Sequence, residues 1–538
     1  MKFPISLKNN FDKLNIFLML AILAIGLAIR LIGIDVGLPN TPDPRETLIA
    51  EDILNLINFT APPEIYNWPG TAWFYLIAFV GKVLSIFGLE MNVVRVIWIA
   101  RVINVLLSTS TIWFTYSLGS QCFNKCVGQI AAGFLAVSML HATNESRFAL
   151  VDIPATFCVT LFLWCVARDT QLTLRTCLWL GIIAGIGVAV KFTTVFVGLS
   201  LLVFIRTENF FQKYAMIFGL AAFTFTLICP YWLYDLFSSQ WNYFFNDFWY
   251  EARHYHLGHF GLFSTGDTGW VNKFLYLWTL LRWGHGVPLA LLVGLSIIYV
   301  LSTSVLSLKQ PSVVNLFTNK NARNGLLLLA FVVPYLLFIG SFKVSFTRHL
   351  LILYPVFAIL AAVFLVSLNR WIGAIIWSGV WLYSFVYTVA FATVMLTQPT
   401  GQEVSDWVSE NIPHDEVITH APEVLFTWLI PELDRDMEVG ATESEWVLII
   451  QPNRGVFEKY RMNPQNYEKV DWYPLENFEV EETLEFYEDI LGEGNQYEWY
   501  KTFRRSPQFL GIRISVNNAP FPMQALTHPE FHLYRRSK

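Results

Sequence analysis

Apolar runs of roughly 15 to 25 residues recur along the first three quarters of this sequence, and each is nearly or fully long enough to cross about 30 Å of hydrocarbon as a helix. With 54% hydrophobic residues, 14% charged residues and a mean hydropathy of +0.46, the 538-residue chain has too few polar side chains to cover a soluble globule. The sequence therefore predicts an α-helical, polytopic membrane protein.

We predict about eleven transmembrane helices from the lengths of these runs. They cover approximately Leu14 to Ile34, Arg101 to Gly119, Val127 to Leu140, Ile153 to Val166, Cys177 to Val190, Thr193 to Ile205, Tyr214 to Ile228, Val287 to Val305, Gly325 to Gly340, Leu350 to Leu368 and Trp371 to Leu396. The first run lacks a small-residue cleavage site, so we expect it to remain as a membrane anchor.

The run from Trp73 to Phe87 decides the topology, since counting it as a span reverses the side of every later loop. If it lies at the outer interface, most loop lysines and arginines fall on the cytoplasmic side, as the positive-inside rule requires. Its aromatic residues also suit the headgroup level. We therefore predict a plasma (inner) membrane protein with a cytoplasmic N-terminus, with a full span at this run as the alternative.

The chain divides into two regions. Residues 1–398 form the predicted transmembrane domain, with outer loops at 35–100 and 141–152, and about 25 of the 41 acidic residues lie after Gln398. In residues 399–538, Trp446 to Ile450 is typical of a buried strand and Glu481 to Leu491 of a helix. We expect a soluble α/β or α+β domain there, on the extracytoplasmic side.

The first outer loop carries Asp43 and Glu46 three residues apart, with Pro44 between them. This spacing fits a capping box, with Asp43 as the N-cap of a helix that starts at Pro44. It equally fits a carboxylate that acts as general base or binds a cation. Spacing alone does not separate the two interpretations.

The second outer loop crowds His141, Asn144, Glu145, Arg147 and Asp152 between two apolar runs. An Asp near Pro154 is often only a helix cap. Two acidic residues at one membrane face, however, form a pair that binds a metal or divides base and stabiliser roles.

Several short motifs, in this order, carry a family resemblance. They are Thr41-Pro42-Asp43, Tyr66-Asn67-Trp68-Pro69, Ala100-Arg101 and Ser146 to Asp152. In this arrangement the chain resembles the polyprenol-phosphate-dependent glycosyltransferases of the GT-C class, and within it the bacterial relatives of protein O-mannosyltransferases and aminoarabinose transferases (glycosyltransferase family 39 type).

The resemblance implies an inverting transfer of a sugar from a polyprenyl-phosphate carrier to a lipid, glycan or protein acceptor outside the cytoplasm. It places Asp43 as the base that activates the acceptor and Asp152 as the second acidic residue. The sequence departs from the family at Pro44, where many members have a glutamate. The lysine-proline-proline motif of the aminoarabinose enzymes is also missing, which disfavours a lipid A aminoarabinose transferase.

Such a reaction needs cations to hold the leaving phosphate, and arginine meets phosphate with two parallel hydrogen bonds. Snorkelling toward headgroups is the alternative for each of these cations. The candidates for contact with substrate, phosphate included, are Glu46, Arg147, Lys191, Glu251, His254, Tyr255, His259, Lys343 and Arg348. Among them, the histidines near Glu251 suggest a metal site at first, but their spacing favours substrate or phosphate contact.

The predicted function is therefore a glycosyltransferase that works among membrane lipids. Its donor is a lipid-phosphate sugar, and it has no nucleic-acid partner. Its metal requirement stays open, with Asp43 and Asp152 as the ligands of a divalent cation if one binds. The alternatives are a polytopic transporter or lipid flippase, which needs charges inside its spans, and a non-catalytic assembly subunit.

Overall fold

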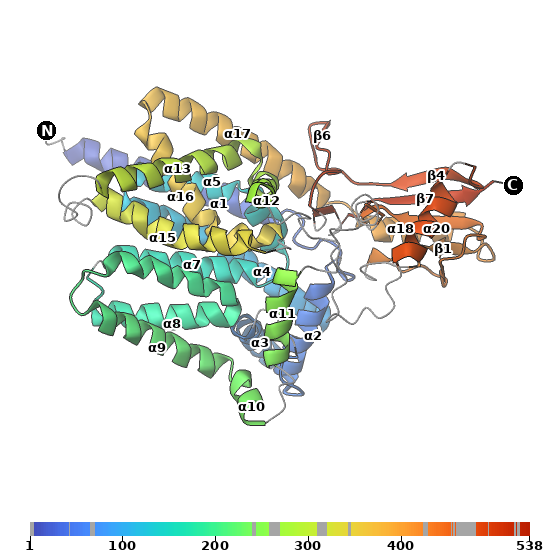
Figure 1. The fold of residues 1–538 in the computed structure, drawn as a ribbon, viewed down its shortest axis with the longest axis horizontal. Helices are drawn as coiled ribbons and strands as arrows, with labels where there is room; N and C mark the ends of the chain where they lie inside the picture. The colour runs from blue at the N-terminus through green and yellow to red at the C-terminus, as the bar shows by residue number, and fades with distance from the viewer. Residues whose placement is uncertain are drawn as a thin grey trace.

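The computed structural model describes most of the chain. The described residues are 5–41, 43–64, 70–169, 171–238, 244–257, 270–308, 320–342, 346–422, 429–452, 454–455, 458, 480–492, 494–520, 523–524 and 528–537. A bundle of roughly parallel helices forms the larger part, and a smaller domain that contains a β-sheet stands at one end of it (Figure 1).

The bundle contains one helix for each predicted span. In chain order they are α1 (Ile5–Leu31), α4 (Val93–Cys122), α5 (Lys125–Ala136), α7 (Asp152–Arg168), α8 (Leu174–Val190), the 3₁₀ helix η2 (Phe192–Phe204), α9 (Phe210–Ile228), α13 (Val287–Leu308), α15 (Lys320–Gly340), α16 (Tyr354–Ser367) and α17 (Arg370–Val394). Seven helices in the described part of the chain are long and apolar enough to cross a membrane. The polytopic helical fold is thus confirmed, while the number of crossings stays a prediction.

One predicted span is wrong at its C-terminal end. The predicted helix from Val127 to Leu140 ends at Ala136, and the chain then bends by 68° into the segment Leu140–Arg147. That segment consists of the π-helix η1 (Leu140–Asn144) and the short helix α6 (Glu145–Arg147). Because the residues at the bend are as apolar as the helix before it, hydropathy does not reveal the break.

Helix η2 reaches further than its 13 residues suggest. A 3₁₀ helix rises about 2.0 Å per residue, so this segment extends about 26 Å, compared with about 20 Å for an α-helix of the same length. The tighter winding thereby brings a short apolar run close to the thickness of the hydrocarbon layer.

Small residues allow neighbouring bundle helices to touch. A Cβ atom at Gly128 of α5 would lie 2.4 Å from the Tyr116 carbonyl oxygen of α4, and one at Gly185 of α8 would lie 2.6 Å from the Ala221 carbonyl oxygen of α9. Membrane helices associate through this kind of close backbone packing, since lipid provides no hydrophobic drive between them. These contacts hold the bundle beneath the outer loops.

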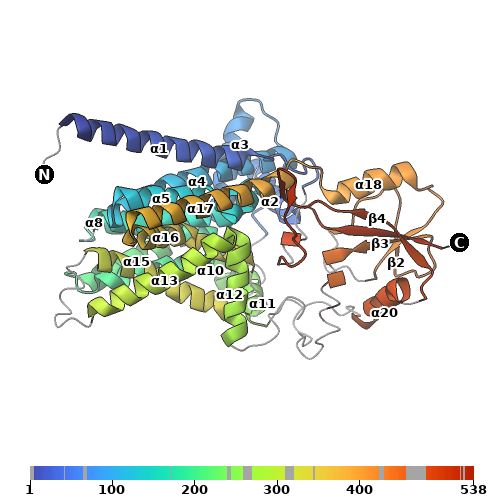
Figure 2. The same cartoon turned by 90° about the horizontal axis from the view of Figure 1, so that it is seen from above.

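The predicted outer loops form further helices near the end of the bundle that faces the C-terminal domain. They are α2 (Pro44–Asn58), α3 (Thr71–Ile86), α10 (Tyr231–Ser238), α11 (Phe244–Leu257), α12 (Trp270–His285) and η3 (Thr347–Leu353). Figure 2 shows α3 running across the direction of the bundle helices. This orientation favours the predicted interfacial position over a span, although the sidedness of the chain stays a prediction.

The C-terminal domain is a mixed sheet between two helices. Its strands, β1 (Ile418–His420), β2 (Glu438–Val439), β3 (Trp446–Ile450), β4 (Tyr497–Phe503) and β7 (Phe531–Arg536), lie in the order β2-β1-β3-β7-β4. Along β3, Leu448 packs toward α18 (Thr400–Asn411) and Val447 toward α20 (Val480–Leu491), because successive side chains point to opposite faces. The predicted strand and helix are both confirmed.

Candidate functional site

Asp43 lies directly before α2 and is bound by an arginine of the same turn. Its carboxylate accepts a hydrogen bond from the backbone N of Arg45 at 3.1 Å, which confirms the predicted N-cap. The Arg45 guanidinium adds two more, from Nε to Oδ1 at 2.9 Å and from Nη2 to Oδ2 at 2.5 Å. The Asp43 side chain is fully buried, while that of Arg45 is 20% exposed. The cap is thus also one half of a bidentate ion pair.

Glu46 does not complete a capping box, and that interpretation of Glu46 is wrong. Its carboxylate instead receives Nε and Nη2 of Arg101 at 2.9 and 2.6 Å. Thr41 Oγ1 and the backbone N of Ala149 donate to it as well, at 2.5 and 2.6 Å. Because both oxygens are occupied inside the protein, these contacts favour a structural role for Glu46 over the predicted substrate contact.

The segment before Asp152 is fixed by buried hydrogen bonds. Asn104 of α4 donates from Nδ2 to the carbonyls of Phe148 and Leu150, at 2.5 and 3.0 Å. Trp73 of α3 donates from Nε1 to the carbonyl of Ala149 at 3.2 Å. With Glu46 holding the backbone N of the same alanine, four hydrogen bonds from three elements define this stretch.

Asp152 is the first residue of α7 and faces a lysine across the site. The Lys191 ammonium lies 2.5 Å from Asp152 Oδ1, and the two side chains are 13% and 4% exposed. Lys191 stands between α8 and η2, where the chain turns. The interpretation of Asp152 as a simple helix cap is wrong, since Val151 occupies the cap position and Asp152 binds a cation from another element.

A cavity of about 310 Å³ opens between these elements. Its wall carries three cations, Arg45, Lys191 and Arg348, and two carboxylates, Asp152 and Glu251. Apolar side chains form much of the remainder, namely Leu150, Val151, Phe192, Phe248, Ala252, Phe338, Ile339 and Phe342. The cavity therefore offers positive charge beside an apolar wall, which suits an anionic group attached to a lipid chain.

Electrostatic interactions join the two acidic residues through Arg45. Burial by itself raises the pKa of the Asp43 carboxyl, but the Arg45 guanidinium, assisted by Arg348, holds that pKa below its usual range. Arg45 also attracts Glu145 and Asp152. Asp43 and Asp152 thus belong to one site, with Arg45 between Asp43 and the cavity.

Glu145 is a buried carboxylate near the same site. Its side chain interacts electrostatically with those of Asp152, Arg45, Arg348 and Asp43. Its Oε2 atom has no hydrogen-bond partner among the described residues. Burial, and after it the charge of Asp152, raise the pKa of the Glu145 carboxyl to about 7, so this group holds a proton for part of the time near neutral pH.

The predicted contacts with substrate or phosphate separate into two groups. Lys191 and Arg348 line the cavity, as does Glu251. The fully buried Arg147 instead donates to the backbone carbonyls of Ile29, Ile32 and Thr143. These bonds direct its guanidinium into the bundle, and they favour a structural role.

Four other predicted substrate contacts lie near the end of α11 or outside the described residues. His254 and Tyr255 belong to α11, the helix that also brings Glu251 to the cavity. His259 and Lys343 lie outside the described residues, as do Tyr66 to Pro69 of the family resemblance. Their roles stay predictions.

Sequence reasoning missed Arg45, although the sequence held a signal for it. Arg45 stands in the first turn of α2, where the helix dipole disfavours a cation. Such a position suggests that a nearby anion compensates, and Asp43 does so here. A basic residue in the first turn of a predicted helix, where the helix dipole disfavours it, therefore indicated the site.

The side chains around Asp43 and Asp152 give little support for a bound metal ion. No group of three His, Cys, Asp or Glu residues with metal-site geometry occurs in the described part of the chain. Asp43 and Asp152 each face a cation of the protein, at 2.5 Å in both cases. Both carboxylates are thus occupied by cations of the protein, and a divalent cation at this site stays a prediction.

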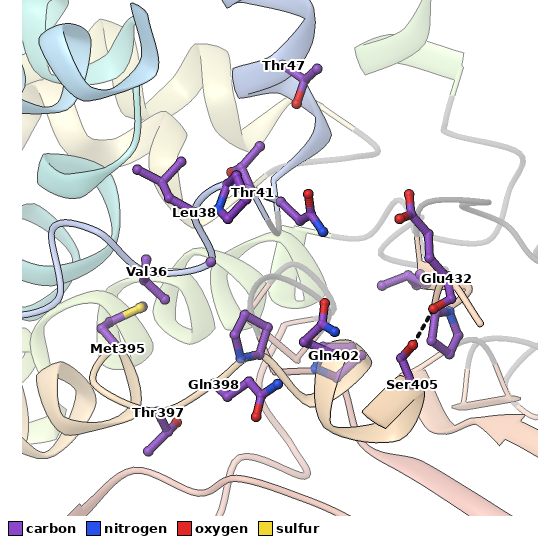
Figure 3. Close-up of a pocket in the computed structure, with 18 of the residues that line it drawn as sticks. Val36, Leu38, Thr41, Thr47, Met395, Thr397, Gln398, Gln402, Ser405 and Glu432 are labelled. Atoms are coloured by element: carbon purple, nitrogen blue, oxygen red, sulfur yellow. Dashed lines mark hydrogen bonds between the residues drawn. The ribbon is translucent and has the colours of Figure 1, made fainter. Parts of the chain in front are cut away.

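A second and larger cavity, of about 1160 Å³, lies between the first outer loop and the C-terminal domain. Figure 3 shows Leu38 and Thr41 of that loop on one side and Gln402, Ser405 and Glu432 of the C-terminal domain on the other. The carboxylates Asp35, Glu51 and Glu432 line it, and the described residues add no Lys or Arg to its wall. Thr41 lines this cleft and also binds Glu46, so the cleft adjoins the turn that holds Asp43.

Comparisons with known proteins match both the sequence and the fold. Residues 72–234 match the family model described as dolichyl-phosphate-mannose-protein mannosyltransferase. This range contains Asp152 and Lys191. No curated protein matches the sequence.

Two solved structures have a similar fold. The oligosaccharyltransferase AglB of Archaeoglobus fulgidus, in complex with an inhibitory peptide and a dolichol-phosphate, is 12% identical, with a TM-score of 0.51 over 98% of this chain and 89% of that one. Apo ArnT of Cupriavidus metallidurans is 13% identical, with a TM-score of 0.50 over 83% of this chain and 88% of that one. The predicted resemblance to GT-C glycosyltransferases is confirmed.

Proposed function

Starting from a polytopic membrane protein with the fold of the GT-C glycosyltransferases, we propose that this chain transfers a sugar from a polyprenyl-phosphate carrier to an acceptor on the extracytoplasmic side. One observation carries the proposal: Arg45, Lys191 and Arg348 line one cavity together with phenylalanines, and Asp43 lies directly behind Arg45. The cations suit the phosphate, and the apolar wall suits the first isoprene units. AglB, which has a similar fold, was solved with a dolichol-phosphate.

Arg45 has two roles in this proposal. Before the donor binds, it neutralises Asp43 and keeps the carboxylate a weak base, because it lowers the pKa of Asp43. The monoanionic phosphodiester of the donor in the cavity competes for the same guanidinium, which is 20% exposed and lines the cavity. As Arg45 turns to the phosphate, Asp43 is released to accept a proton.

The chemical step is then a single displacement. The acceptor hydroxyl gives its proton to Asp43, and its oxygen forms a bond to the anomeric carbon. The bond from that carbon to the phosphate oxygen breaks, and the phosphate leaves with the electron pair, held by Arg45, Lys191 and Arg348. Attack opposite the leaving phosphate inverts the anomeric configuration.

The larger cleft is the proposed entry for the acceptor. Its wall carries carboxylates and amides without Lys or Arg among the described residues, so it disfavours an anionic acceptor. We expect a neutral or cationic glycan, lipid headgroup or peptide hydroxyl there. This cleft disfavours anionic lipid A as acceptor, as the missing lysine-proline-proline motif also does.

The transporter alternative gains no support from the buried charges. Arg30, the one charge well inside a predicted run, donates to Ser108 Oγ at 2.6 Å and to the carbonyls of Gly26 and Ala136 at 2.8 and 3.2 Å. It also contacts His141 Nδ1 at 2.8 Å. Bonds to its own helix and to three other elements fix this guanidinium in place, which favours a structural role over that of a moving charge.

Mass spectrometry of lipid-linked sugars tests the function in cells. In cells without the protein, we expect the polyprenyl-phosphate sugar that serves as donor to accumulate, and the corresponding sugar to disappear from surface glycans, lipids or proteins. Wild-type protein restores both, whereas Asp43→Asn does not. Asparagine caps a helix as well as aspartate does, so this variant keeps α2 while it removes the base.

Two results would overturn the proposal. Full restoration by Asp43→Asn would mean that Asp43 is not the base and would favour a non-catalytic subunit. Accumulation of the carrier-linked sugar on the cytoplasmic side alone, in sealed inverted vesicles, would instead indicate a flippase.

A further inference from the structure

A short β-hairpin of the C-terminal domain presents apolar side chains to the outside. Strands β5 (Gln508–Phe509) and β6 (Ile512–Arg513) pair antiparallel, with Leu510 and Gly511 at the turn. Leu510 is 89% exposed and Ile512 71% exposed, among the highest values for large apolar side chains in the described residues. Two exposed aliphatic side chains on either side of Gly511 indicate an apolar environment that the soluble domain does not supply.

The turn conformation strengthens this point. Leu510 has a φ of 48° and Gly511 a φ of 84°, the combination that Asn-Gly ordinarily provides in a two-residue hairpin. A bulky leucine is disfavoured at positive φ. Leucine at this position improves neither folding nor solubility, so its apolar side chain must serve another purpose.

The hairpin is fixed at the outer end of the last bundle helix. Thr393, one residue before the end of α17, donates from Oγ1 to the Gln508 carbonyl at 3.1 Å. Ile514 and Val516, which follow β6, pack on the cluster around Phe391 of α17. Figure 1 shows β6 beside the end of α17 that faces the C-terminal domain. The tip therefore lies at the level where a spanning α17 leaves the membrane.

Three arginines surround a cavity of about 390 Å³ at the same place. Arg504, Arg505 and Arg513 line it with the hydroxyls of Thr393, Thr397, Ser506 and Ser515, and the described residues add no carboxylate to its wall. Arg505 lies 2.9 Å from Glu403 and Arg504 lies 3.3 Å from Glu530, whereas no ion pair is recorded for the described Arg513. The cavity thus combines positive charge with hydroxyl donors, which is the chemistry that binds a phosphate.

We propose that the hairpin Gln508–Arg513 is a membrane anchor: Leu510 and Ile512 enter the outer leaflet, and the cavity lined by Arg504, Arg505 and Arg513 holds a phospholipid phosphate. Apolar side chains flanked by arginines are the combination that an interfacial membrane segment requires. The contact positions the C-terminal domain against the bundle by its own attachment to lipid, independently of any transfer reaction. The occupant is a bulk phospholipid, with its phosphate at the depth of the α17 end.

Fluorescence quenching by brominated lipids tests the depth of the tip. The full chain, with Cys126→Ser to remove the exposed native thiol, carries Leu510→Cys labelled with bimane and is reconstituted with phosphatidylglycerol brominated on its acyl chains. We expect at least a twofold loss of fluorescence relative to unbrominated lipid. Val439→Cys, 59% exposed on β2 at the sheet edge, is the matched control that stays unquenched. Equal quenching at the two sites would overturn the proposal.

Native mass spectrometry tests the arginine cavity in the same full-length protein. We expect phosphatidylglycerol to remain bound after detergent extraction, and Arg513→Gln with Arg505→Gln to lower the bound fraction by tenfold or more. Arg535→Gln, 40% exposed on β7 elsewhere in the domain, should retain lipid as the wild type does. Inorganic phosphate at millimolar concentration should not displace the lipid, because the acyl chains and the hairpin tip add to the contact. Displacement by phosphate alone, or by polyprenyl phosphate at one equivalent, would reassign the cavity and refute a bulk-lipid anchor.

Discussion

Replacement of Arg45 by glutamine separates the two roles that the structure gives this side chain. Arg45 holds Asp43 through two hydrogen bonds, at 2.9 and 2.5 Å, and also lines the cavity proposed for the donor phosphate. The backbone hydrogen bond from residue 45 to Asp43 does not depend on the side chain, so Arg45→Gln keeps the helix cap. The variant therefore removes one cation without removing α2.

The magnitude follows from the hydrogen bonds that the phosphate loses. A hydrogen bond to a charged group contributes about 1.5 to 3 kcal/mol, and about 1.4 kcal/mol corresponds to a factor of ten in affinity. We expect the KM for donor to rise by about 10- to 100-fold. The value of kcat should fall as well, because Arg45 also holds the departing phosphate while its negative charge grows.

The pH dependence gives a second and independent signal. Arg45 lowers the pKa of Asp43, so in the wild type the acid limb of kcat/KM that reports Asp43 stands below the usual aspartate range. Without Arg45 the buried carboxyl loses this stabilisation of its charged form, and the limb moves to higher pH. The stability of the fold depends on the same pKa. Because the pKa of Asp43 is lower in the folded protein than its unfolded value of 3.8, the ionised carboxylate stabilises the fold above pH 3.8. This contribution is lost as the pH falls through the folded pKa.

The assay measures release of polyprenyl phosphate from the labelled donor by protein in proteoliposomes, from pH 3.5 to 8. Arg168→Gln is the matched control, because Arg168 stacks on Trp164 at the far end of α7 from the cavity. An unchanged donor KM together with an unmoved acid limb in Arg45→Gln would refute the reasoning. A loss of kcat at unchanged KM would instead place Arg45 in the chemical step alone.

Three further changes test the surrounding structure. Glu46→Ala should lower the thermal stability in detergent, since Arg101 becomes a buried, unpaired charge at a cost of about 3 to 5 kcal/mol. The double variant Glu46→Met with Arg101→Met should recover most of the lost stability. Full stability of Glu46→Ala together with lost turnover would instead make Glu46 a functional residue. Lys191→Met should weaken the binding of polyprenyl phosphate by about tenfold, measured by titration, and unchanged affinity would remove Lys191 from the phosphate site. Gly185→Leu should lower the yield and the melting temperature, because its Cβ would lie 2.6 Å from the Ala221 carbonyl, and an unaltered melting curve would contradict that packing.

The membrane fold was predictable because spanning helices require long apolar runs, which are visible in the sequence. Each predicted span contains a helix, since a single segment satisfies its own backbone groups in hydrocarbon by forming one. The bend after Ala136 and the 3₁₀ winding of Phe192–Phe204 were not predictable, because both depend on packing against neighbouring helices. In the C-terminal domain, β3 was recognisable from five consecutive apolar residues, whereas the two-residue β2 carries no periodic pattern.

The site was predictable only in part, for a related reason. Acidic residues in an apolar chain are rare enough to identify Asp43 and Asp152 as candidates. The cation partner of Asp152 depends on tertiary structure, since Lys191 reaches it from 39 residues away. The partner of Asp43 is local, because Arg45 lies two residues along the chain, and its place in the first turn of α2 was the overlooked signal. Glu46 was ambiguous by spacing, and only its contacts with Arg101 resolve that ambiguity.

The central claim is that Asp43 assists transfer of a sugar from a lipid phosphate, and a single-turnover measurement tests it most directly. Purified protein in proteoliposomes is mixed with a labelled polyprenyl-phosphate sugar and acceptor, and the released polyprenyl phosphate is measured over time for the wild type and for Asp43→Asn. A general base contributes about 100- to 10,000-fold, so we predict a loss of that size. Donor binding should be at least as tight as in the wild type, because the neutral side chain of Asp43→Asn no longer competes with the phosphate for Arg45. Release at the wild-type rate by Asp43→Asn, with the donor bound at least as well, would contradict the account.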